Sequence, residues 1–468
     1  MDNSNNKIHK NVLKSVVEAP AIAVDASVTF SKKIINNRPV RAVQKYVTKL
    51  GPGLVTGAAD DDCSGIVTYS QAGAKFGYAY MWLALFTLPF MATVQEMCAR
   101  IGLVTGRGLA GVLRTHYSKT ILYICTLLLL GANTVNIGAD IGAMASSAQL
   151  LKIFSPFSYS ALAIVFTLLS LGLQVFVPYH KYAKYLKILT LSLIAYIITF
   201  FLVDHSWAEV LRNTLVPRLS LNQDTFYLVM AVLGTTISPY LFFWEASQEV
   251  EKKIDQGEKT LQSRQGADDE IIKEMRKDVY TGMTYSNVIM FFIIGLTAST
   301  LFKNGITSIN TASDAAEALR PLAGDNAALL FTIGVVGIGL LAIPVLAGSA
   351  SYAISEALGW SSGLGKKLNQ ARAFYGVIII SMLVGLAINY LGIDPIRANI
   401  FAAVLNGLVA PVLIVFIIMA TNNAKIMGKW KNGIWTNIFA TIIAVFMGLI
   451  GIVTILGLFG INVFSGYN

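Results

Sequence analysis

Apolar runs recur along the chain from about residue 48 to its end, separated by short segments rich in glycine, proline or charge. A helix needs about 20 apolar residues to cross the hydrocarbon core of a bilayer, because each residue advances it by about 1.5 Å. Eleven such stretches can be placed, centred near residues 60, 88, 133, 165, 195, 236, 292, 340, 382, 409 and 447. The pattern predicts an all-α membrane protein with eleven transmembrane helices.

Composition and charge support this interpretation. Charged residues make up 13% of the chain and hydrophobic residues 55%, whereas an ordinary soluble domain has about 25% charged residues. The composition therefore excludes a soluble enzyme. Three cysteines without metal-ligand spacing predict neither a disulfide framework nor a zinc site.

The net charge of +10 comes from loops on one side of the predicted membrane. With the amino terminus in the cytosol, 29 of the 36 Lys and Arg residues fall on the cytosolic side, as expected for a multi-pass protein of the plasma (inner) membrane. This distribution supports eleven spans, places the carboxyl terminus outside, and makes the lipid bilayer rather than nucleic acid the partner of the chain.

The spans group into two halves of five. We expect a cytosolic tail over residues 1–47 and one transmembrane domain over 48–468, with repeat one at about 48–206, repeat two at about 222–420 and an extra helix at about 434–460. The tail lacks the apolar core and cleavage site of a signal peptide. An odd number of spans in each half forces the two halves into opposite orientations.

The first predicted span contains three adjacent carboxylates, Asp60, Asp61 and Asp62, about ten residues from its start. Such residues are costly at mid-membrane depth and mark a functional site. Successive residues of a helix point about 100° apart, so the three could approach one ligand only if the helix unwinds, which Gly57 and Gly65 would permit. Unwound backbone is tolerated at this depth only where it lines a cavity.

The sixth span is interrupted in the corresponding place, at Gly234-Thr-Thr-Ile-Ser-Pro-Tyr. Pro239 removes an amide donor and clashes with the carbonyl four residues before it. By itself this could be an ordinary proline kink. Interrupted first helices in both halves, however, indicate an inverted-repeat transporter whose site lies at the middle of the membrane.

Other polar positions within spans have more than one interpretation. Asn133, Asn136 and Asp140 share one helical face, which suits either a proton path or interhelical hydrogen bonds. Asn406 and Pro411 suggest a weaker third break, in span 10.

Charged residues near the cytosolic ends of spans are expected to be solvated or paired. This group comprises Glu96, Glu245 and Glu249. We also expect residues 250–278 to form a solvated connector. A short surface helix is expected within it over Glu270, Glu274, Arg276 and Lys277.

Several segments resemble the NRAMP family of divalent metal transporters. Gly51-Pro-Gly, the polar break and Gln71-Ala-Gly-Ala-Lys-Phe-Gly-Tyr match the family's first span and following loop in register. Ala99-Arg-Ile-Gly-Leu-Val-Thr-Gly-Arg-Gly-Leu is similar to its cytosolic signature between spans 2 and 3, and Asn136-Ile-Gly-Ala-Asp is similar to its third span. The resemblance covers residues 48 to 460 and implies a LeuT-type fold, a five-plus-five inverted repeat with unwound helices 1 and 6.

The departures from the family pattern fall on the site. The family's Asp-Pro-Gly-Asn is Asp62-Cys-Ser-Gly here, and its Met-Pro-His is Ser238-Pro-Tyr. Thr235 falls where the family uses a backbone carbonyl as a ligand. The resemblance, with the two extra carboxylates, implies metal ligands among Asp60, Asp61, Asp62, Ser64, Thr235 and Ser238, and a gating or proton-path role for Asn136, Asp140, Tyr240 and Asn406.

These substitutions favour a hard ion. Thioether and imidazole ligands suit late transition metals, whereas carboxylate, hydroxyl, carbonyl and water suit Mg²⁺, Ca²⁺ or Mn²⁺. We therefore expect a secondary transporter, not an enzyme and without a cofactor, that moves a divalent cation such as Mg²⁺ or Mn²⁺ into the cytosol by alternating access, with proton coupling left open. The alternative is a fold repurposed for an organic cation or an amino acid, with Asp62 pairing with an ammonium group beside the aromatic run from Tyr240 to Trp244.

Overall fold

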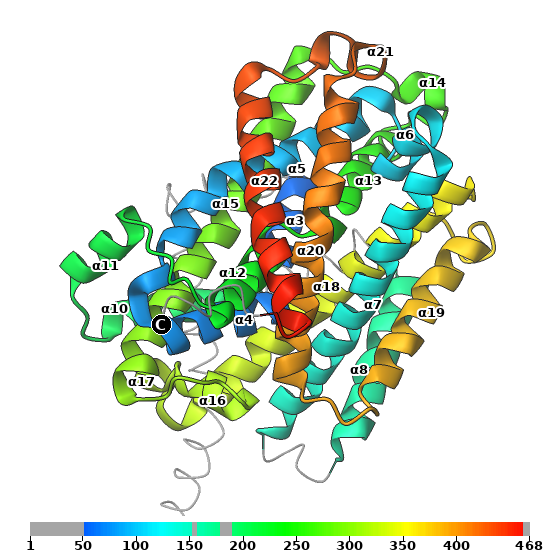
Figure 1. Cartoon of the computed structure of the whole chain (residues 1–468). Helices are drawn as coiled ribbons and strands as arrows, with labels where there is room; N and C mark the ends of the chain where they lie inside the picture. Colours follow the sequence, from blue (N-terminus) through cyan, green and yellow to red (C-terminus); the bar gives the residue numbers. More distant parts are fainter. Residues whose placement is uncertain (1–50, 152–156, 178–189, 462–468) are drawn as a thin grey trace, which may run out of the picture. The chain divides into compact units, whose positions relative to one another are not determined.

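The computed structural model of the protein describes residues 51–151, 157–177 and 190–461, and within these ranges all regular structure is helical (Figure 1). The predicted tail over residues 1–47 lies outside the described residues. The longer elements begin and end as follows: α3 (Pro52–Asp60), α4 (Cys63–Phe76), α5 (Trp82–Thr105), α6 (Leu109–His116), α7 (Lys119–Gln149), α8 (Tyr159–Phe176), α10 (Ile194–Leu202), α11 (Trp207–Leu215), α12 (Gln223–Thr236), α13 (Pro239–Asp255), α15 (Asp269–Thr300), α18 (Ala327–Leu358), α19 (Arg372–Ile388), α20 (Pro395–Asn422) and α22 (Ile434–Leu458). Four short helices lie in connecting segments: α14 (Leu261–Arg264), α16 (Ala312–Glu317), α17 (Arg320–Ala323) and α21 (Ala424–Met427).

Eight helical segments within the described ranges are long and apolar enough to cross a membrane. They correspond to spans 2, 3, 4, 6, 7, 8, 10 and 11 of the prediction. Helix α19 is apolar but shorter, and the first span is divided between α3 and α4. Helix α10 follows a short 3₁₀ turn at Thr190–Leu193, and the residues before that turn lie outside the described ranges. The all-α membrane class and the broken first and sixth spans are confirmed, while the exact count of eleven stays a prediction.

The helix contacts show the pseudo-two-fold symmetry of an inverted repeat. Helix α7, the third span, packs against α18, the eighth. The first span (α3 and α4) packs on α15, and its counterpart, the sixth (α12 and α13), packs on α5, so exchanging the halves preserves these contacts. The contact of α7 with α19 likewise has its counterpart between α18 and α8. The boundaries of the two repeats remain a prediction.

Glycines allow the broken helices to approach their neighbours closely. A Cβ atom added at Gly57 of α3 would overlap with the backbone of Gly282 in α15. A Cβ atom at Gly234 of α12 would likewise overlap with the backbone of Ala403 and Gly407 in α20. Backbone-to-backbone contact of this kind is typical of small residues at helix interfaces in membranes. It fixes the lateral position of the polar segments at the two breaks.

Two expectations about the helices were wrong. Helix α20 continues from Pro395 to Asn422 with Pro411 inside it, so span 10 has no break. Residues 269–277 are the first turns of α15 rather than a separate surface helix, because α15 runs without interruption to Thr300. The charged segment before the seventh span is therefore shorter than expected.

Candidate functional site

The first span is broken immediately after its carboxylates begin. Helix α3 ends at Asp60, and α4 begins at Cys63 with Asp62 as its N-cap in an extended conformation. The carboxylate of Asp62 accepts a hydrogen bond from the amide of Gly65, at 2.8 Å. Asp62, one of the polar residues that made a continuous helix improbable, therefore caps the amino-terminal end of α4.

The sixth span is broken in the same manner. Helix α12 ends at Thr236, Ser238 precedes α13, and Pro239 occupies its first turn, where a missing amide donor costs nothing. The hydroxyl of Ser238 lies 2.8 Å from the carbonyl oxygens of both Gly234 and Thr235, the groups that the break leaves without helical partners. In this arrangement Ser238 completes the end of α12.

Asp62 is the centre of a polar cluster that joins three helices. Its Oδ1 accepts from the hydroxyl of Ser64 at 2.5 Å, and its Oδ2 accepts from the side-chain amide of Asn136 on α7 at 3.0 Å. The hydroxyl of Tyr240 on α13 lies 3.4 Å from the same oxygen and 3.1 Å from the carbonyl oxygen of Ala59. Asn136 thus touches the central carboxylate directly.

The two breaks meet through a pair of hydroxyls. The Oγ of Ser64 and the Oγ1 of Thr235 are 3.2 Å apart. The structure therefore brings together five of the predicted site residues, from both halves of the chain: Asp62, Ser64, Asn136, Thr235 and Tyr240.

Asp60 and Asp61 face a different neighbour. Both carboxylates lie at hydrogen-bond distance from the hydroxyl of Ser286 on α15, at 2.6 Å and 3.1 Å respectively. One oxygen of each, Asp60 Oδ1 and Asp61 Oδ2, has no hydrogen-bond partner among the described residues. Ser286 was missed in the sequence because a single serine in an apolar span is unremarkable. Only the fold brings it to the break.

The remaining predicted residues are buried, and most of their polar atoms are unpaired. Both carboxylate oxygens of Asp140 and both side-chain polar atoms of Asn406 lack a hydrogen-bond partner within the described ranges. Asp140 lies beside the backbone of Ser64, which brings it near the cluster around Asp62. Asn133, by contrast, donates to the carbonyl of Leu346 on α18, which is the interhelical role that its position allowed.

All ten predicted site residues are closed off from solvent, with exposed fractions of 0 to 1%. No group of three or more His, Cys, Asp or Glu side chains that could hold a metal ion occurs within the ranges that the structure describes. The three consecutive aspartates therefore do not converge, because Asp62 turns toward α7 and α13 while its two predecessors face α15. A cation here would meet one or two carboxylates together with hydroxyl, carbonyl and amide oxygens.

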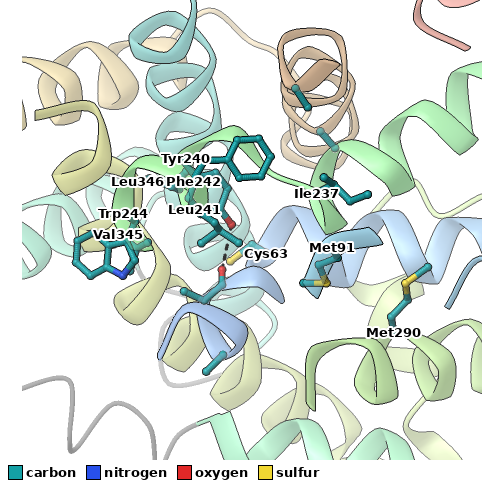
Figure 2. Close-up of a cluster of buried hydrophobic side chains, with 14 of the residues drawn as sticks. Cys63, Met91, Ile237, Tyr240, Leu241, Phe242, Trp244, Met290, Val345 and Leu346 are labelled. Carbon is teal, nitrogen blue, oxygen red and sulfur yellow. Dashed lines mark hydrogen bonds between the residues drawn. The ribbon is translucent and has the colours of Figure 1, made fainter. Parts of the chain in front are cut away.

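The aromatic run that follows the second break is core packing. Phe242, Phe243 and Trp244 are almost completely buried, and Figure 2 shows Phe242 and Trp244 with Val345 and Leu346 of α18. Trp244 makes an edge contact with Tyr352. Cys63 is also buried, and its thiol lies 3.5 Å from the carbonyl oxygen of Val335. The aromatic faces are thus engaged with the scaffold.

The charged residues at the helix ends behave in two ways. Glu96 is paired as expected, with Arg100 and Arg276. Glu249 is also paired, with Lys252 at 3.7 Å, whereas Glu245 is not solvated and accepts from the hydroxyl of Thr56. Both are buried because α13 lies against α3, α5 and α18 along this stretch.

The fold is of the LeuT type found in membrane transporters. Its two discontinuous helices meet at a buried carboxylate, and the surrounding apolar helices are related by an inverted repeat. The chain belongs to the Nramp (natural resistance-associated macrophage protein-like) family, whose model matches residues 53–457.

A relative in sequence agrees with this assignment, and solved structures share the fold. A protein of Klebsiella pneumoniae named divalent metal cation transporter MntH is 24% identical, and the match covers 92% of this chain and 99% of the relative. The manganese transporter of Eremococcus coleocola, solved with an aromatic bis-isothiourea compound, superposes with a TM-score of 0.67 at 16% identity, over 88% of this chain and 87% of that one. Mhp1, a nucleobase-cation-symport-1 family transporter, superposes with a TM-score of 0.53 at 14% identity, over 87% and 91% of the two chains.

Proposed function

We propose that this protein transports a divalent metal cation, a hard ion such as Mg²⁺ or Mn²⁺, into the cytosol by alternating access around Asp62. The observation that carries the proposal is the position of this carboxylate, where the two broken helices meet and where Ser64 and Asn136 already bind it. Membership of the Nramp family and the names of the relatives support the class of substrate.

The chemistry of the cluster favours a hard ion. Its groups are carboxylate, hydroxyl, amide and backbone carbonyl, and the neighbouring thiol of Cys63 is directed to the carbonyl of Val335. Mg²⁺ gives up its water reluctantly and is usually held by one or two carboxylates. A site in which at most two carboxylates face the same ligand suits an ion that keeps part of its hydration shell.

Cation binding would require the present hydrogen bonds to be exchanged. The two oxygens of Asp62 accept from Ser64, Gly65 and Asn136 in the closed arrangement. An entering cation would replace some of these donors, while Thr235 and Ser238 would turn oxygen atoms toward it. At most one of Asp60 and Asp61 would contribute its free oxygen, from the side of α15.

We further propose that the first and sixth spans move against a scaffold of spans 3, 4, 8 and 9, and that the amino terminus is cytosolic. An inside-negative potential provides about 2.3 kcal/mol per charge per 100 mV, and therefore about 4.6 kcal/mol for a dication. Uptake can thus proceed with little help from protons. If protons are coupled, Asp140 with its two unpaired oxygens is the group next to the site that would carry them.

The test is flux of Mn²⁺ and Mg²⁺ in proteoliposomes. We expect Asp62→Ala to abolish flux, because it removes the carboxylate at the junction of the breaks. Asp224→Ala is the matched control, since this carboxylate is exposed and paired with Lys75. Flux unchanged by Asp62→Ala would refute the site. A calorimetric titration that detects binding of an amine or an amino acid, and of no divalent ion, would favour the organic-solute alternative.

A further inference from the structure

Two buried glutamates lie on α13 beyond the candidate site. Glu245 and Glu249 are one turn apart and both are 0% exposed. Glu245 Oε1 and both oxygens of Glu249 have no hydrogen-bond donor among the described residues. The Lys252 ammonium group lies 3.7 Å from Glu249 and is 36% exposed. Burying carboxylates with so little compensation is expensive, and within a membrane helix it marks a function.

The position of these glutamates relates them to Asp62. Tyr240, whose hydroxyl reaches Asp62, begins the same helix. At about 1.5 Å per residue, Glu245 lies about 7.5 Å and Glu249 about 13.5 Å farther along the axis of α13. The two side chains therefore follow the site in the direction of the carboxyl-terminal end of α13.

Helix α3 covers this stretch of α13. The hydroxyl of Thr56 donates to Glu245 Oε2, and Thr56 lies one turn before Asp60. At the beginning of α3, the amides of Gly53 and Leu54 donate to the carboxylate of Asp278 on α15, at 2.9 and 3.2 Å. The near end of α3 is thus held by two polar contacts, one to α13 and one to α15.

The glutamates become available only if α3 moves. Within the part of the chain that the structure describes, Thr56 is the single hydrogen-bond donor to Glu245, so separation of α3 from α13 would leave this carboxylate without that partner. Glu251, on the same helix, behaves differently because its carboxylate accepts from the hydroxyl of Tyr352 on α18, at 3.2 Å. If these side chains served only to hold α3 against α13, one carboxylate would be enough. Helix α13 carries two here, Glu245 and Glu249.

We propose that Glu245 and Glu249 form a second station for the divalent cation, which the ion occupies after leaving Asp62 when α3 separates from α13. This inference rests on the proposed function. Two carboxylates and the hydroxyl of Thr56 are oxygen ligands suited to a partly hydrated Mg²⁺ or Mn²⁺. The station lies on one side of the site, so it affects cation affinity at one face of the membrane.

The experiment measures Mn²⁺ transport from each face separately, in intact cells and in inverted membrane vesicles. For Glu245→Gln and Glu249→Gln we expect KM to rise at least tenfold at one face and to stay within twofold at the other. Glu245→Asp keeps a carboxylate and is expected to restore most of the affinity. Glu251→Gln is the control on the same helix and is expected to change neither KM.

Equal changes at both faces, or no change at either, would overturn the second station. Glu249→Gln keeps the test decisive if Glu245→Gln fails to fold, because it removes a long ion pair, 3.7 Å to the partly exposed Lys252, and leaves the contact of α3 with Glu245 in place. Failure of the proposed function has a separate signature. It would appear as normal Mn²⁺ flux in Asp62→Ala, whatever the glutamate variants do.

Discussion

Replacing Glu96 with glutamine should destabilise the protein through one buried ion-pair network. Glu96 on α5 accepts from Arg100 on the same helix, at 3.0 Å, and from Arg276 on α15, at 2.9 Å. Arg100 also donates to the carbonyl of Trp430 and, at 2.7 Å, to the side chain of Asn432. The network therefore joins α5, α15 and the segment before α22.

The expected magnitude follows from burial. The side chains of Glu96 and Arg100 are 5% and 3% exposed, and removing one partner of a buried ion pair costs about 3 to 5 kcal/mol. Arg276 is 47% exposed and can be hydrated instead, and Arg100 keeps two neutral acceptors. We therefore expect Glu96→Gln to lower the free energy of unfolding by about 3 kcal/mol, near the lower limit of that range.

An exposed ion pair between the same regions provides the control. Asp269 at the start of α15 lies 2.9 Å from Lys429, and their side chains are 82% and 67% exposed. Exposed pairs contribute at most about 1 kcal/mol, so Asp269→Asn should have a small effect. The assay is the unfolding free energy of each variant in bicelles, measured by steric trapping. Equal losses for Glu96→Gln and Asp269→Asn would refute the reasoning from burial.

Two further predictions concern the broken helices. Ser238→Met places a thioether beside the cluster. In flux assays, Cd²⁺ should then compete more strongly than Mg²⁺ for transport, since sulfur ligands favour softer metals. An unchanged order of competition among these ions would show that Ser238 does not select the ion. Gly234→Ala adds a Cβ where the backbone of α20 already lies and should cost about 1 to 3 kcal/mol by overpacking. Gly448→Ala is the control, because no atom lies within 4 Å of its added Cβ, and it should be neutral or slightly stabilising. The assay is thermal unfolding of both variants, and equal melting temperatures would contradict the close helix contact.

The sequence by itself determined the class of fold and the places where it is interrupted. Long apolar runs and the low charged fraction require a membrane protein, because no water-soluble core could bury so much apolar surface. The three adjacent carboxylates from Asp60 to Asp62, and Pro239 in the corresponding place of the second half, indicated both breaks. A proline by itself does not break a span, since Pro411 lies inside the continuous helix α20. Apolar runs, carboxylates and prolines are local properties of the chain, which can be recognised without knowing what lies beside each span.

The tertiary structure decided which polar side chains meet. Three consecutive aspartates look alike in the sequence, but α15 supplies Ser286 to the first two, while α7 and α13 supply Asn136 and Tyr240 to Asp62. Glu245 was expected to be a solvated or paired charge at a helix end, yet α3 covers it. The partners in these contacts are 74 to 226 residues apart in the chain. Pairing over such separations depends on how the helices pack, which the periodicity of a single span does not encode.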